Sequence, residues 1–180
     1  MNQTASGLEN TRGMDDNLLF TSREIELLRS LASKVAELAA RPIESEKKKL
    51  WTAHNDLEVV RPLIFCDPEN GWNEIITQDQ ILCENPLARV WEMTLRKEIF
   101  WGEKMNDDRV IEAFFNVSFH YTDSGYGLTE TKIGGEDGGS FIYDFPIKDY
   151  ENDFENLHLP EISIDTKRTN EVLSLARHIF

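Results

Sequence analysis

The chain has few of the residues that would favour binding to nucleic acid or to an anionic membrane. Lysine and arginine total 19 against 33 aspartates and glutamates, which gives a net charge of −14. Phosphate neutralisation needs clustered cations, so this composition argues against both kinds of partner. The basic cluster Lys47–Lys49 is flanked by Glu44 and Glu46 and is typical of a solvated helix face.

Cysteine and long apolar runs are also scarce. Cys66 and Cys83 lie far apart, and no apolar signal segment follows Met1. This pattern favours a reduced, cytoplasmic compartment over a disulfide-stabilised secreted domain. No apolar run approaches the roughly 20 residues that a membrane span requires, so no membrane partner is expected.

The N-terminal part predicts a leader followed by two helices. Residues 1–20 show no periodicity and predict a flexible leader, with residues 21–180 forming one domain. Thr21 and Glu24 form a capping-box pattern, and the helix that follows should end near Pro42. Its expected apolar stripe is Ile25, Leu28, Leu31, Val35 and Leu38. A second helix is predicted from Ser45 to about Leu57, with Leu50, Trp51 and Leu57 buried.

The middle of the chain predicts a strand, a helix and a second strand. Val59–Phe65 is mostly apolar and predicts a parallel strand covered on both sides. Asn85 and Pro86 suit the start of a helix through about residue 101. Its expected buried side consists of Leu87, Val90, Trp91, Leu95, Ile99 and Phe100. Val110–Tyr121 predicts the second strand, parallel to the first, with the helix crossing between them.

The C-terminal part predicts a hairpin and two helices. Leu128–Ile133 and Ser140–Phe145 should pair through Gly134–Gly139. Glu136 and Asp137 in this glycine run favour a hairpin turn over a phosphate-binding loop. A short helix is expected around residues 150–157, and Thr166–Phe180 predicts a final amphipathic helix.

Two stretches carry a family resemblance. Residues 41–72 read RPIESEKKKLWTAHNDLEVVRPLIFCDPENGW, and residues 85–117 read NPLARVWEMTLRKEIFWGEKMNDDRVIEAFFNV. Together they resemble the N-terminal part of the uroporphyrinogen decarboxylase-like superfamily, which includes corrinoid-linked methyltransferases. The resemblance implies an α/β fold, a partial (β/α)8 TIM-type barrel with N-terminal helices, the first βα units and a β-hairpin insertion. A complete barrel typically needs about 250 residues, so a truncated chain is expected that is either of low stability or self-associated.

The resemblance also places a candidate substrate mouth. Chemistry in such barrels sits where strands end, which here selects Asp67, Glu69 and Trp72 after the first strand and Asn116 and His120 near the end of the second. Catalytic residues are not identified. The family's decarboxylases carry an arginine-rich loop after the first strand for the substrate's carboxylates. Asp67 and Glu69 stand in that loop and would repel such a substrate, which favours the methyltransferase branch.

Cofactors of the methyltransferase branch are implied only for a longer enzyme. That branch binds zinc through a histidine and two cysteines in the C-terminal half of its barrel and takes cobamide from a partner corrinoid protein. Cys66 and Cys83 do not match this pattern, so no metal site is expected in the chain. Each cysteine is instead expected to be buried as a small apolar side chain.

The sequence is compatible with three functions. The first is the N-terminal part of a corrinoid-dependent methyltransferase or demethylase acting on a small molecule. The second is a uroporphyrinogen decarboxylase-type lyase of porphyrin biosynthesis. The third is a non-catalytic acidic interaction domain whose strands a partner completes. A His-x-Cys motif with a distant cysteine beyond Phe180 would favour the first.

Overall fold

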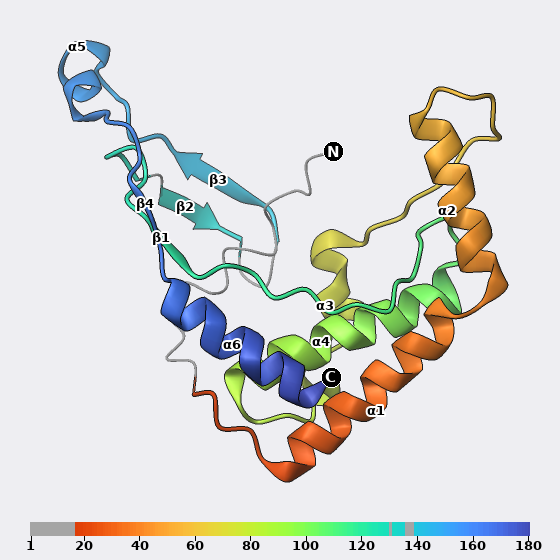
Figure 1. Cartoon of the computed structure of the whole chain (residues 1–180). Coiled ribbons are helices and arrows are strands. Elements are labelled where there is room, and N and C mark those ends of the chain that lie inside the picture. The colour runs from red at the N-terminus through yellow and green to blue at the C-terminus, as the bar shows by residue number, and fades with distance from the viewer. Residues whose placement is uncertain (1–16, 130, 136–138) are drawn as a thin grey trace. The chain divides into compact units, whose positions relative to one another are not determined.

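The computed structural model describes residues 17–129, 131–135 and 139–180. They form a mixed α/β structure of helices and small antiparallel sheets, and no closed barrel is present among them (Figure 1). The chain divides into two compact units. The first runs to Phe115 and includes His178–Phe180, and the second is Asn116–Arg177.

Helix α1 (Ser22–Ala39) begins as its sequence predicts. The Thr21 hydroxyl accepts a hydrogen bond from the Glu24 N–H, and the Glu24 carboxylate accepts one from the Thr21 N–H. These reciprocal bonds confirm the predicted capping box. Of the predicted stripe, Leu28, Val35 and Leu38 are buried.

Helix α2 (Pro42–Asn55) begins earlier than predicted because Pro42 occupies its first turn, where the missing N–H costs nothing. The helix ends two residues before Leu57, close to the predicted end, but the predicted burial of Leu57 is wrong. Leu57 lies beyond it in a left-handed conformation, with φ of 62°, and its side chain is 92% exposed rather than buried.

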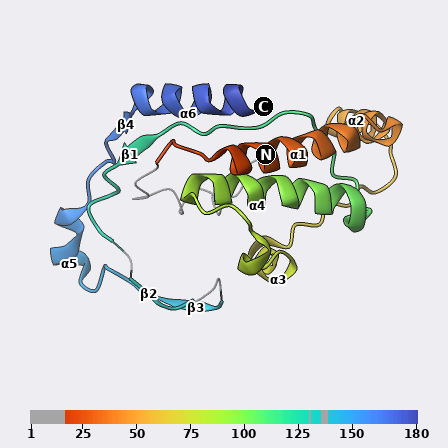
Figure 2. The same ribbon diagram turned by 90° about the horizontal axis from the view of Figure 1, so that it is seen from below.

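Helix α4 (Pro86–Phe100) lies beside α1 (Figure 2). The Asn85 side chain caps it by accepting hydrogen bonds from the N–H groups of Leu87 and Ala88. The helix continues into a π-helical turn, η5 (Trp101–Met105), and the chain leaves it at Asn106 with φ of 53°. Val90 is 39% exposed, so its predicted burial is wrong. Between α2 and α4 lie η3 (Glu69–Gly71), α3 (Trp72–Ile75) and η4 (Gln78–Gln80).

Three buried carboxylates hold the loops of the first unit. Glu24 accepts hydrogen bonds from the N–H groups of Glu84 and Asn85. Glu44 binds the N–H of Ile111 and the side chains of Arg41 and Lys47. Glu92 binds the N–H groups of Leu82 and Cys83 and the Arg96 guanidinium. Each buried charge is therefore compensated by donors from other segments.

The two predicted parallel strands are wrong. Residues 59–65 form no strand, and in 110–121 only the last residue belongs to one. Ile111 is buried, but many of the other apolar side chains in these segments are exposed instead of covered, among them Val59, Ile64, Phe65, Phe114 and Phe119. Apart from Tyr121, no residue of either segment pairs with a neighbouring strand in the described residues. Aspartate side chains, not a neighbouring strand, accept hydrogen bonds from backbone N–H groups here. Asp108 accepts from the Ile64 N–H, and Asp107 accepts from the Cys66 N–H.

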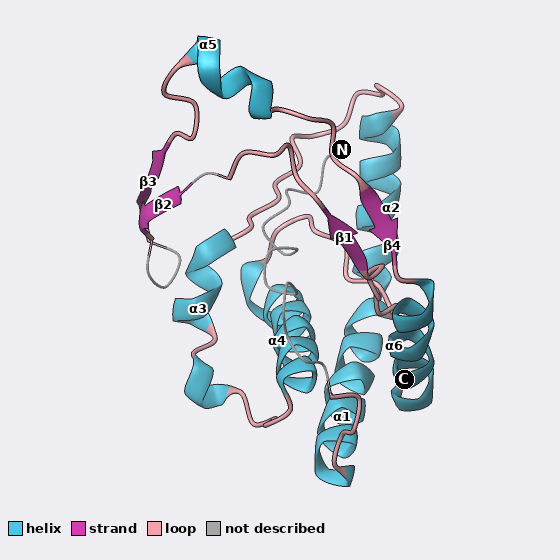
Figure 3. Cartoon of the chain, turned by 90° about the vertical axis from the view of Figure 1, so that its left-hand side faces the viewer, coloured by secondary structure: helices cyan, strands magenta, loops and turns pink. Residues whose placement is uncertain are grey.

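The second unit contains two antiparallel pairs (Figure 3). Strand β1 (Tyr121–Asp123) pairs with β4 (Ile162–Ile164), with Tyr121 opposite Ile164. Strands β2 (Thr131–Gly134) and β3 (Phe141–Asp144) form the predicted hairpin, with Ile133 opposite Ile142. Residues 136–138 of its predicted glycine turn lie outside the described residues.

Helices complete the C-terminal part. The predicted short helix is α5 (Tyr150–Asp153) followed by η7 (Phe154–Asn156), and the predicted final helix is α6 (Thr166–Ile179), whose last two residues belong to the first unit. None of the helices described is long and apolar enough to cross a membrane.

Most of the predicted leader, residues 1–16, lies outside the described residues. Its last residues contact α4 and its cap: the Asn85 amide donates to the Asn17 carbonyl at 2.6 Å, and the ring centroids of Phe20 and Trp91 lie 5.4 Å apart.

Candidate functional site

The loop that carries Asp67, Glu69 and Trp72 follows an extended segment held by two aspartates. Arg61 donates to both carboxylate oxygens of Asp108, and the Asp108 N–H donates to the Ile64 carbonyl at 2.8 Å. The Arg61 hydrogen bond lowers the pKa of Asp108 to about 2, although partial burial opposes it. The start of the loop is therefore fixed by ionic contacts instead of sheet pairing.

Asp67 and Trp72 are joined within the loop. The Asp67 carboxylate accepts hydrogen bonds from the Trp72 indole N–H and the Glu69 N–H, both at 3.0 Å. Glu69 has φ of 51°, in the left-handed region that is unfavourable for a side-chain-bearing residue. Strained backbone of this kind clusters at functional sites.

The Trp72 ring is buried within the first unit and does not form an exposed wall of a pocket. It is 3% exposed, its ring centroid lies 4.5 Å from that of Trp101, and Phe100 lies edge-on at 5.8 Å. Trp101 in turn donates to the Cys66 carbonyl at 3.0 Å. The indole thus anchors the loop to the end of α4.

Lys97 adds a cation that sequence reasoning missed. Its amine lies 5.5 Å from the centroid of the Trp72 ring, within cation–π range. Burial lowers the pKa of Lys97, while the charge of Asp67 raises it in part. The sequence could have indicated this role, because Lys97 lies four residues before Trp101 and residues four apart share a helix face. The loop and α4 therefore bring together an acid, an indole and a half-buried amine.

Asn116 and His120 lie in the second unit, so the described contacts bring together only Asp67, Glu69 and Trp72. The Asn116 side chain is exposed. The backbone of His120 binds the start of α6: its N–H donates to the Thr169 hydroxyl at 3.0 Å, and its carbonyl accepts from the Asp165 N–H at 2.8 Å.

The two cysteines have different environments. Cys83 is buried beside Glu92, and burial with that carboxylate raises the pKa of its thiol to about 12. Cys66 is exposed, which corrects its predicted burial. Across residues 17–129, 131–135 and 139–180, no group of three histidine, cysteine or acidic side chains is placed to hold a metal.

A polar cavity of about 460 Å³ borders the extended segment. Three cations line it, but each has partners: Arg41 and Lys47 bind Glu44, and Arg61 binds Asp108. Such neutralised cations hold the fold together and leave little net charge for a ligand.

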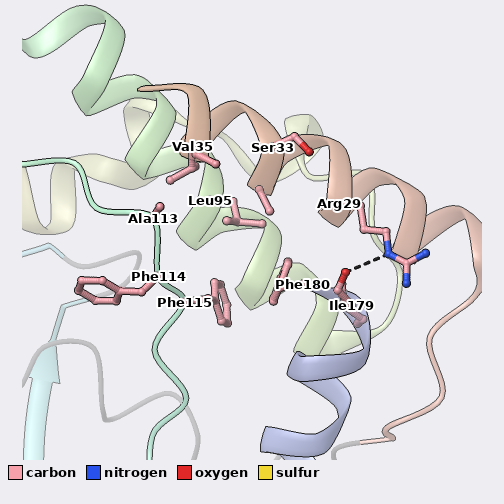
Figure 4. A pocket seen from close by; sticks show the side chains of 11 residues that line it. Arg29, Ser33, Val35, Leu95, Ala113, Phe114, Phe115, Ile179 and Phe180 are labelled. Carbon is pink, nitrogen blue, oxygen red and sulfur yellow. Dashed lines mark hydrogen bonds between the residues drawn. The ribbon is translucent and has the colours of Figure 1, made fainter. Parts of the chain in front are cut away.

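An apolar groove of about 440 Å³ was not predicted (Figure 4). It is formed by the face of α1 between Arg29 and Ala36, by Leu95 of α4, by residues 113–115 and by residues 179–180. Its walls come from segments far apart in sequence, so no local pattern could have revealed it.

Comparison with protein-family models, with curated proteins and with solved structures finds no match for the chain.

Proposed function

We propose that the chain is the N-terminal part of a uroporphyrinogen decarboxylase-like enzyme of the corrinoid-dependent methyltransferase or demethylase type. The observation that supports this most directly is the state of residues 59–65 and 110–120. Both are mostly apolar and pair with no strand, and although Ile111 is buried, Ile64 is 63% exposed and Phe119 is 68% exposed. Buried strands of a parallel barrel have this composition, and they cover their side chains only when neighbouring strands and helices are present.

The charge of the loop favours methyl transfer over decarboxylation. Asp67 and Glu69 are exposed acids, and Lys97 is a half-buried cation that lies over Trp72 and interacts with Asp67. A substrate with several carboxylates needs several guanidinium groups in bidentate geometry. One half-buried lysine does not meet that need. In this proposal the loop forms part of the mouth for a small substrate, together with Asn116 and His120.

Zinc and cobamide are assigned to parts of the enzyme other than this chain. Cys66 is exposed, Cys83 is buried beside a carboxylate, and the described residues offer no third ligand near either. The donor set does not fit a zinc site, which needs three or four converging ligands. No chemical step through zinc is therefore assigned to these residues.

A second candidate is a non-catalytic acidic interaction domain. The exposed side chains on the β2–β3 hairpin favour it, because a two-stranded hairpin is marginally stable without a covering surface. In that case a partner protein would cover Ile133, Ile142 and the neighbouring aromatic residues.

The reading frame beyond codon 180 and in adjacent genes tests the first proposal. A barrel half with His-x-Cys and a distant cysteine would support methyl transfer, and the absence of any such half would overturn it. A titration with uroporphyrin tests the decarboxylase alternative. We expect no saturable binding, and low-micromolar affinity that survives moderate salt would establish the decarboxylase branch instead.

A further inference from the structure

The groove on α1 has a charge unlike that of the rest of the chain. Acids make up 33 of the 180 residues, yet none of the residues that line the groove is acidic. Arg29 is the charged residue in that lining, and the others are mostly alanine, aliphatic or aromatic. A ligand in the groove would therefore meet one cationic side chain and no acidic one, which favours an anion with an apolar body over a cation.

Arg29 is held in place at one end of the groove. Its Nε donates to the Ile179 carbonyl at 2.9 Å (Figure 4). Its Nη2 donates to the His178 carbonyl, also at 2.9 Å. Its Nη1 has no hydrogen-bond partner in the part of the chain that the structure describes. A guanidinium fixed through two nitrogens is preorganised to donate through the third, which lowers the cost of binding.

Aromatic and aliphatic side chains form the rest of the groove. The rings of Phe115 and Phe180 have centroids 4.6 Å apart, and both contact Trp91. Val35 and Leu95 are buried beside them, whereas Phe114 is 59% exposed. This surface offers dispersion contacts and two exposed rings, Phe114 and Phe180, that a bound apolar chain would cover.

We propose that this groove binds a medium-chain carboxylate, such as octanoate or decanoate. The carboxylate binds Arg29 Nη1, and the apolar chain lies along Ala36, Leu95 and Phe115. The face of α1 from Arg29 to Ala36 is about 10 Å long at the helical rise, which suits a medium-chain body better than a long fatty acid. The cavity volume of about 440 Å³ also falls within the range of small-molecule sites.

Calorimetric titration of the full chain with decanoate tests the proposal. We expect saturable binding of one decanoate, and weaker binding of decanol and of decyltrimethylammonium. Arg29→Met should weaken decanoate binding by roughly ten- to a hundredfold, the effect of a lost charge-assisted hydrogen bond. Arg29→Lys should retain part of the affinity, and decanol binding should be the same in both variants.

Two variants of α1 separate the groove from the rest of the helix. Ala36→Phe fills the groove and should abolish binding, whereas Ser30→Phe, exposed on the same helix outside the lining, should leave it unchanged. Circular dichroism of each variant checks that the helix content of the chain is unchanged.

Several outcomes would overturn the proposal. One is undetectable decanoate binding. Another is equal affinity for the anionic, neutral and cationic probes, which would remove the role of Arg29. A third is undiminished binding by a folded Ala36→Phe chain. A dimer in light scattering that Ala36→Phe converts to monomer would assign the groove to a second copy of the chain instead.

Discussion

The carboxylate of Glu92 accepts a hydrogen bond from the Cys83 N–H at 2.8 Å, and this contact fixes the loop that precedes α4. Glu24 of α1 binds the next part of the same loop through the N–H groups of Glu84 and Asn85. Burial alone would raise the pKa of Glu92 and of Glu24, but the hydrogen bonds that each accepts lower it below the ordinary value. Two ionised, buried carboxylates thus connect the two longest helices through one loop.

Glu92→Gln should lower the free energy of unfolding by about 2 kcal/mol or more. The amide would replace a carboxylate that accepts from three donors, and its own N–H groups would face some of them. Urea unfolding measures the change. The matched control is Glu103→Gln, a surface carboxylate 3.3 Å from Lys34, which should change stability by less than about 1 kcal/mol. Equal effects would contradict the role given to Glu92.

The stability of the chain should fall in acid partly through Asp108. Its pKa is 3.8 for an unperturbed group and about 2 in the folded chain. Because the folded-state pKa is the lower one, its contribution is complete above about pH 5 and is lost as the pH falls toward about 2. Asp108→Asn should flatten the pH dependence of unfolding in this window. Parallel curves for the two proteins would contradict this.

The two thiols should differ in reactivity. Cys66 is exposed, and Cys83 is buried with a pKa raised to about 12. Since the thiolate is the reactive species, iodoacetamide at mildly alkaline pH should label Cys66 in the folded chain and both cysteines in denaturant. Mass spectrometry of the labelled peptides measures this. Rapid labelling of Cys83 without denaturant would show that the loop opens readily.

Gly127→Ala should disrupt the second unit more than Gly125→Ala. Both glycines have positive φ, but a Cβ on Gly127 would lie 2.2 Å from the Asn156 carbonyl oxygen, whereas one on Gly125 meets nothing within 4 Å. We expect Gly125→Ala to cost about 1 kcal/mol and Gly127→Ala to cost at least twice as much. Hydrogen exchange at the His158 N–H, which binds the Tyr126 carbonyl, reports the difference. Similar exchange rates in the two variants would count against the close contact.

The candidate site was only partly predictable. Asp67, Glu69 and Trp72 lie within one short loop, so their proximity follows from the sequence, and the indole–carboxylate bond closes that loop. Lys97 comes from α4, and its contact with Trp72 depends on how the helix packs against the loop. The placement of Asn116 and His120 relative to that loop stays a prediction.

The sequence by itself determined the elements whose signals are local. The capping box of α1, the Asn85 cap of α4 and the β2–β3 hairpin each depend on groups a few residues apart, and each was predicted correctly. Only the tertiary structure decided that residues 59–65 remain unpaired, that Glu44 binds the Ile111 N–H, and that α1 shares a groove with Phe180. The reason is physical: strand pairing and the burial of a charge depend on which distant segment supplies the partner groups, and periodicity along the chain carries no record of that partner.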